Sequence, residues 1–189
     1  MNVLDHGVVE LEEMMGGDAA VVRAARMCYQ STGTPESDER LIHHLMRAGH
    51  NTVFEHAVFR WHVKCPLFVA RQWLRHRMGV FSEKSLRYCA ADREYYVPDL
   101  PDADVYVRAC EAAFDVYESL GWKREEARLV LPLSIYTEFV WTVNCWSLVN
   151  WLEKRLDKAA QREHREYAEA VRGLWHEAMP ITSAAWETR

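Results

Sequence analysis

Residues 57–65 read AVFRWHVKC, and apolar and polar side chains alternate along this stretch. Ala57, Phe59 and Trp61 belong to the apolar set, which would share one face of an extended chain. A period of two is typical of a strand with one buried face. Residues 139–144 show the same alternation. The sequence therefore predicts two strands of a small central sheet.

Segments with a helical spacing of apolar residues surround these strands. Ser37 or Asp38 could cap one of these helices, and Pro66 suits the first turn of the helix after the first strand. Glycine or proline lies just beyond several segments, where it would end a helix. The predicted helices cover residues 18–29, 37–48, 66–77, 103–120, 123–130 and 147–178.

The remaining segments are polar. Residues 85–88 are expected to be short and extended, and residues 92–102, with their prolines and aspartates, are expected to form a loop. No change of composition divides the chain. We therefore expect a mixed α/β fold with a small central sheet flanked by helices, in a single domain over residues 1–189.

The composition excludes several classes of protein. Of the 189 residues, 49% are hydrophobic, which is enough for a core and argues against disorder. The net charge of −5 argues against non-specific binding to duplex nucleic acid. The eight glycines include no GxG pattern, so the Rossmann fingerprint and the phosphate-binding P-loop are both missing.

The cysteines and the N-terminus bear on location. The five cysteines are odd in number and widely spaced, without a CxxC pair, so reduced thiols in a cytoplasmic protein are expected. None of the apolar runs approaches the roughly 20 residues of a membrane span. The first six residues lack the basic segment that would open a signal peptide.

The densest polar cluster is Arg71-Gln72-Trp73-Leu74-Arg75-His76-Arg77, which closes with Arg75-His76-Arg77 at the end of a predicted helix. Cations at that end also suit the helix dipole, so a solvated helix end is the simpler interpretation. Three consecutive residues spread over much of a helix circumference, however, and some must face the protein. Because Ser85 and Arg87 follow closely, and arginine forks bind phosphates, we expect an anion site.

Other polar residues allow two interpretations. Asn144 and Asn150 bracket a strand-to-helix junction, where capping is the simpler role for Asn144. Arg128 and Arg155, taken alone, would be ordinary surface residues or partners of carboxylates. Five histidines lie between residues 43 and 62, but their spacing matches no metal-binding motif, so no metal is predicted. His50 opens a polar run before a strand, a common place for a site residue.

At Arg75-His76-Arg77, seven residues before Ser85, the sequence resembles the flavin-dependent thymidylate synthases, whose hallmark is RHR, seven residues, then Ser. The similarity continues into Arg87-Tyr88 and covers most of the chain. It includes the histidine segment at residues 50–56 and the ARxxLP-like segment at residues 127–132. The combination is far more specific than RHR alone.

The resemblance implies an α/β enzyme that converts dUMP to dTMP. Methylenetetrahydrofolate would supply the carbon, and FAD, reduced by NADPH, would supply the hydride. It also implies a homotetramer whose active sites are shared between subunits. A cationic arginine could stabilise negative charge on the pyrimidine ring without a cysteine nucleophile, and Arg155 is the residue expected in this role.

The resemblance also implies ligands for individual residues. His50 matches a histidine near the flavin and the folate, and with Arg155 it is a candidate catalytic residue. The residues expected to bind the nucleotide are Gln72, Glu83, Ser85, Leu86, Arg87, Arg128 and Arg155. The residues expected to bind FAD are Thr52, Glu55, Arg75, His76, Arg77, Asn144 and Asn150.

The sequence departs from the family pattern mainly on the FAD side. Val53, Val80 and Ala159 stand where the family usually has other residues, and the loop at residues 97–102 is short. Trp146 replaces an arginine expected to contact FAD, so weaker or altered FAD binding is a hypothesis.

Two alternative functions remain open at this point. One is a related enzyme that methylates UMP in a specialised nucleoside pathway. The other is a non-catalytic nucleotide- or RNA-binding relative of the family.

Overall fold

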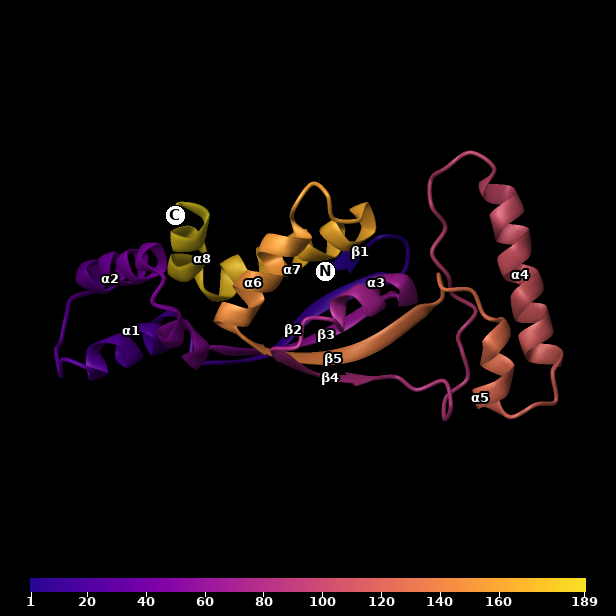
Figure 1. Ribbon diagram of the computed structural model, residues 1–189, viewed down its shortest axis with the longest axis horizontal. Helices are drawn as coiled ribbons and strands as arrows, with labels where there is room; N and C mark the ends of the chain where they lie inside the picture. The colour runs from indigo at the N-terminus through magenta and orange to yellow at the C-terminus, as the bar shows by residue number, and fades with distance from the viewer.

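The computed structural model describes all 189 residues and has a twisted antiparallel sheet at its centre (Figure 1). The sheet contains five strands in the order β1-β2-β3-β5-β4. Their bounds are Asn2–Val3 for β1, Gly7–Met15 for β2, Val58–Pro66 for β3, Gly79–Glu83 for β4 and Tyr136–Asn144 for β5. The mixed α/β class with a central sheet is therefore confirmed, although only β3 and β5 were predicted.

The alternation predicted for the stretch at residues 57–65 is confirmed. β3 lies between β2 and β5, and Trp61 lies opposite Trp141 in the register with β5. Phe59, Trp61 and Val63 are fully buried on one face. On the other face Arg60 forms ion pairs with carboxylates of β2. One face of the sheet therefore carries the core.

The helices contribute three groups around the sheet (Figure 1). Helices α3, α6 and α7 lie over the sheet, α1, α2 and α8 gather at one end, and α4 and α5 form an arm at the other. Their bounds are Asp18–Met27 for α1, Pro35–Ala48 for α2, Leu67–Trp73 for α3, Ala103–Ser119 for α4, Arg124–Ala127 for α5, Cys145–Arg155 for α6, Arg162–Ala178 for α7 and Pro180–Glu187 for α8; the 3-10 turns are Asn51–His56 (η1) and Arg128–Val130 (η2). No helix is both long enough and apolar enough to cross a membrane.

Tryptophan side chains fill the space between the sheet and its covering helices. Trp73 of α3 lies 4.4 Å from Trp151 of α6 and 5.4 Å from Trp141 of β5, measured between ring centroids. All three are almost fully buried. Buried aromatic rings contribute both area and specific edge or stacking contacts. This cluster fixes α3 and α6 against the sheet, directly beneath the polar residues described below.

The single helix predicted over residues 147–178 is wrong, because the chain breaks once within this range, between Arg155 and Arg162. Between α6 and α7 it makes a tight turn, in which the Asp157 carboxylate accepts a hydrogen bond from the Ala159 backbone N–H. Arg165 also donates to the Lys158 carbonyl there. The break places Arg155 in the last turn of α6, and α7 ends at Ala178, as predicted.

Three other local predictions need correction. The helix predicted over residues 66–77 ends at Trp73, so the Arg75–Arg77 segment lies in the connection to β4. Residues 85–88 form a turn rather than an extended segment. Thr34, not Ser37 or Asp38, caps α2, and its side chain accepts from the Ser37 N–H.

Candidate active site

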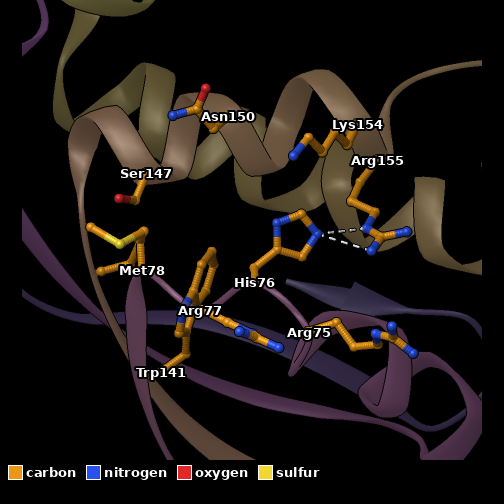
Figure 2. Close-up of a pocket in the computed structure, with 10 residues that line it drawn as sticks. Arg75, His76, Arg77, Met78, Trp141, Ser147, Asn150, Lys154 and Arg155 are labelled. Carbon is orange, nitrogen blue, oxygen red and sulfur yellow. Dashed lines mark hydrogen bonds between the residues drawn. The ribbon is translucent and has the colours of Figure 1, made fainter.

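A pocket of about 460 Å³ opens between α6 and the connection from α3 to β4 (Figure 2). The helix contributes side chains spaced by about one turn, and the connection contributes consecutive ones. Its lining residues are Arg75, His76, Arg77, Met78, Trp141, Val143, Ser147, Asn150, Lys154 and Arg155. We call this the α6 pocket. It brings together five residues predicted as site residues, from segments about 70 positions apart in the chain.

Arg155 and His76 are joined by hydrogen bonds (Figure 2). The Arg155 guanidinium donates from Nε and Nη2 to His76 Nε2, at 3.1 and 2.9 Å. Burial and the charges of Arg155 and Lys154 lower the pKa of His76 to about 4. His76 is therefore neutral near pH 7 and accepts through Nε2, which fixes the orientation of the guanidinium without pairing its charge.

Gln72 lies behind the same arginine. Arg155 Nη2 donates to the Gln72 backbone carbonyl at 2.9 Å, and the Gln72 side chain donates from Nε2 to Gln161 Oε1 at 2.6 Å. Gln161 precedes α7. The break between α6 and α7 thus turns the chain back onto α3, and Gln72 and Arg155 share one network.

The charge of the α6 pocket suits an anion. Arg75, Arg77 and Lys154 form no ion pair, and no Asp or Glu is among the lining residues. The buried Trp141 contributes an aromatic edge to the floor. A planar molecule with a diphosphate, such as FAD, matches this combination of unpaired cations and apolar floor.

A second pocket, of about 520 Å³, lies beyond the end of β4. Its polar lining includes Glu83, Ser85 and Arg128, and Leu86 lies beside them. We call it the η2 pocket, because Arg128 opens that turn. Glu83 accepts a hydrogen bond from Thr137 at 2.8 Å. The two pockets share no lining residue, so the nucleotide residues predicted from the sequence fall into two groups.

Arg87 lines neither of these two pockets. Its guanidinium forms an ion pair with Glu125 at 2.8 Å, and it lies 5.5 Å from the ring of Tyr88. Both members of the ion pair are exposed to solvent. The pair can therefore exchange for an anionic ligand at low cost, since exposed ion pairs contribute little stability.

The site residues predicted in the histidine segment lie outside both pockets. His50, Thr52 and Glu55 sit on or beside η1, which packs against α1 and α6. Asn144 caps α6, where its side-chain oxygen accepts from the Ser147 N–H at 2.8 Å. Capping, the simpler of the two roles considered for Asn144, is confirmed.

Trp146 joins α6 to η1. Its ring stacks on Phe54 at 6.3 Å between centroids and 29° between planes. Phe54 is fully buried, so the tryptophan at this family arginine position is anchored in the core. Where the family usually has a charged arginine, this chain therefore has an aromatic side chain that packs against Phe54.

Sequence reasoning missed five lining residues of the α6 pocket: Met78, Trp141, Val143, Ser147 and Lys154. Lys154 lies one helical turn beyond Asn150, and this spacing could have found it once the helix was placed. The sequence pattern placed Trp141 on the buried face of a strand. In the structure it belongs to the core and also forms part of the floor of the α6 pocket. No group of three or more His, Cys, Asp and Glu side chains is arranged to hold a metal ion.

The chain is similar to known proteins over nearly its whole length. The family model described as thymidylate synthase complementing protein matches residues 10–181. The flavin-dependent thymidylate synthase of Thermosipho africanus is 43% identical over 210 residues, which cover 97% of this chain and 92% of the relative. That of Thermus thermophilus is 40% identical over 208 residues, covering 98% of this chain and 77% of the relative.

Two solved structures with the same fold carry a bound nucleotide analogue. The UMP/dUMP methylase PolB from Streptomyces cacaoi, bound with 5-Br dUMP, matches with a TM-score of 0.91 and 31% identity. The match covers 100% of this chain and 97% of the other. The structure of the same methylase bound with 5-Br UMP matches with a TM-score of 0.89 and 33% identity. This match covers 99% of this chain and 96% of the other.

Proposed function

Because the chain belongs to the family of flavin-dependent thymidylate synthases, which are methyltransferases, we propose that it methylates C5 of the uracil ring of dUMP to form dTMP. Methylenetetrahydrofolate supplies the carbon, and FAD reduced by NADPH supplies the hydride. The observation that carries the proposal is the α6 pocket, where the RHR segment meets Arg155 and Gln72 through hydrogen bonds.

In this proposal the nucleotide is held by residues of both pockets. Gln72 and Arg155 belong to the network of the α6 pocket, and Glu83, Ser85, Leu86 and Arg128 line the η2 pocket. Arg87 exchanges Glu125 for the phosphate or a pyrimidine oxygen of the nucleotide. The bidentate geometry of the guanidinium suits these oxygens.

Arg155 stabilises the negative charge that develops on the pyrimidine ring. Burial lowers the pKa of Arg155, but a guanidinium stays charged near pH 7. The neutral imidazole of His76 holds it without cancelling that charge. A preorganised cation in a partly buried site lowers the barrier because it needs no reorientation during the reaction.

FAD is held by Arg75, His76, Arg77, Asn150 and the amide of Asn144, with Thr52 and Glu55 from the histidine segment. Lys154 joins this set, since it faces the α6 pocket unpaired (Figure 2). When bound, the reduced flavin supplies the hydride. His50 lies in the same histidine segment, and in the proposal it orients the ligands near the flavin and the folate.

The active site is completed by a second copy of this chain. The two pockets share no residue, and η1 lies outside both, so one chain does not enclose a nucleotide, FAD and folate. A homotetramer with shared active sites, as the family resemblance implies, brings the separated groups together. A cytoplasmic location completes the proposal, because all five cysteines are free thiols.

UMP is a second candidate substrate. Its support is the solved methylase, which is described as a UMP/dUMP methylase and matches this chain over its full length. Discrimination between the two nucleotides depends on a single hydroxyl. A hydroxyl of that kind is rejected strongly only where buried groups are arranged against it.

Product identification tests the proposal directly. The purified protein is incubated with FAD, NADPH, ¹³C-methylenetetrahydrofolate and either dUMP or UMP, and the products are identified by mass spectrometry. We expect labelled dTMP from dUMP. Labelled 5-methyl-UMP as the main product would instead support the UMP alternative, and NADPH oxidation that no nucleotide stimulates would contradict both.

A further inference from the structure

His164, near the start of α7, is a fully buried histidine that no predicted role uses. Its ring stacks on Trp73 at 5.4 Å between centroids and 26° between planes, and lies 5.7 Å from Trp151. The two indoles hold the imidazole in one plane. Burying a polar ring in this way costs free energy unless its nitrogens form hydrogen bonds.

The two ring nitrogens of His164 have different surroundings. Nδ1 lies 3.4 Å from Gln72 Oε1, whereas Nε2 is buried without a partner. Because Nε2 has no acceptor within reach, the single proton of the neutral ring sits on Nδ1, where Gln72 Oε1 can accept it. Burial and the charges of Arg155 and His76 lower the pKa of His164 to about 3, so the ring is neutral and has one proton to donate.

That proton fixes the direction of the Gln72 amide. A glutamine amide has two orientations, which exchange its oxygen and its NH₂ group. With Oε1 toward His164, the NH₂ group faces Gln161 and uses one hydrogen there. The reverse orientation would place the NH₂ group against Nδ1–H, donor against donor.

We infer that His164 is a positioning residue of the nucleotide site, which holds the Gln72 amide so that its second Nε2 hydrogen is free for an acceptor oxygen of the nucleotide. The inference rests on the proposed role of Gln72 at the nucleotide. His164 itself touches no ligand. It lies beside Gln72, in contact with Trp73 and Trp151, and Trp151 also packs edge-on against His76.

Two substitutions separate this role from simple packing. His164→Leu puts an apolar side chain of similar volume in this place and removes the donor, and His164→Asn places a side-chain N–H near the position of Nδ1. Binding of dUMP to the FAD-loaded protein is measured by calorimetry. We expect His164→Leu to weaken dUMP binding about fivefold, the effect of one lost hydrogen bond. His164→Asn should restore it, and FAD affinity should not change.

A double-mutant cycle makes the test specific. If His164 acts through Gln72, then His164→Leu has no further effect on dUMP binding in a Gln72→Ala background. If His164 only fills space, the loss is the same in both backgrounds. That additive result would overturn the inference.

The tautomer can also be read in the unmodified protein, which matters if His164→Leu does not fold. Imidazole ¹⁵N shifts at pH 7 should show the Nδ1–H tautomer for His164, and the Nε2–H tautomer would overturn the inference. If the wild-type protein bound neither dUMP nor UMP, the proposed function and the inference would both fall. Binding of dUMP that His164→Leu leaves unchanged would overturn the inference alone.

Discussion

Arg155 is the side chain on which both halves of the α6 pocket network depend, because it contacts His76 and the carbonyl of Gln72. We expect Arg155→Ala to lower kcat for dTMP formation by about 10²- to 10³-fold, as for other lost preorganised donors. Arg155→Lys keeps the charge but loses the planar fork, so it should recover only part of the rate.

The control for this series is Arg172→Ala. Arg172 pairs with Glu169 one turn away on the surface of α7, so its loss should leave kcat unchanged. Steady-state rates at saturating nucleotide give the comparison. If Arg155→Ala kept more than a third of the wild-type kcat, Arg155 would not act on the reacting ring.

His76 and His164 make the folded state sensitive to acid. Their pKa values fall from 6.5 to about 4 and about 3 on folding. Above pH 6.5 both histidines are mainly neutral in the folded and in the unfolded protein. Between pH 6.5 and about 4 the unfolded chain binds more protons, so the free energy of unfolding falls as the pH falls. His164 should contribute about 2 kcal/mol of this loss between pH 7 and pH 5.

Urea denaturation at pH 7 and pH 5 checks this prediction. The His164→Asn variant cannot take up the proton, so it should lose about 2 kcal/mol less than the wild type between these two pH values. An identical loss in both proteins would mean that His164 is not held neutral in the native state.

The RHR segment shows how far single residues can be predicted. The sequence required only some of its three side chains to face the protein, and in the structure all three line one pocket. Trp141 could not be found in the same way. It reaches the pocket only because the fold brings β5 beside the segment that joins α3 to β4, and no local pattern carries that information.

Helix α6 begins at a residue with two proposed roles. Asn144→Ala removes the cap and should lower the free energy of unfolding by about 1 kcal/mol. Asn144→Asp keeps an acceptor oxygen at the helix N-terminus and should preserve stability. It lacks the amide donors, however, and adds a negative charge near the FAD residues.

The two variants therefore separate capping from cofactor binding. Thermal unfolding reports the cap, and titration with FAD reports the cofactor. We expect both variants to bind FAD more weakly, and only Asn144→Ala to be less stable. Normal FAD affinity in Asn144→Asp would limit Asn144 to capping.

Trp146 gives a second prediction about α6. Trp146→Arg restores the residue type that the family usually has and adds a cation to the flavin side, but it loses the contact with Phe54. We expect tighter, salt-sensitive FAD binding and a loss of about 1 kcal/mol in stability. Trp146→Phe keeps a stacked ring without the charge, and it should not tighten binding. Equal FAD affinity in all three proteins would contradict the prediction.

The helices and strands differ in how well the sequence predicted them. The apolar period continues across residues 147–178, so it concealed the break at Asp157, which side-chain hydrogen bonds create. β4 is a five-residue edge strand with exposed Val80, and its local preference is too weak to identify it without its partner β5. β3 was clear because one face is buried throughout.

At the level of the whole molecule, most of the predicted site residues are divided between two pockets that share no lining residue. The net charge of the chain is −5, yet the α6 pocket has only cationic and neutral lining residues. In the proposed enzyme, the anionic ligands are drawn to a local field rather than to the overall charge. The proposed enzyme needs the α6 pocket of one copy beside the η2 pocket of another.

Complementation between two inactive variants tests this arrangement most directly. Arg155→Ala disables the α6 pocket, and Arg128→Ala disables the η2 pocket. The two chains are co-expressed with different tags, hybrid oligomers are isolated through both tags, and dTMP formation is measured. The arrangement predicts activity in the hybrids well above that of either variant alone, because some sites combine two intact pockets. Hybrids no more active than the single variants would contradict it.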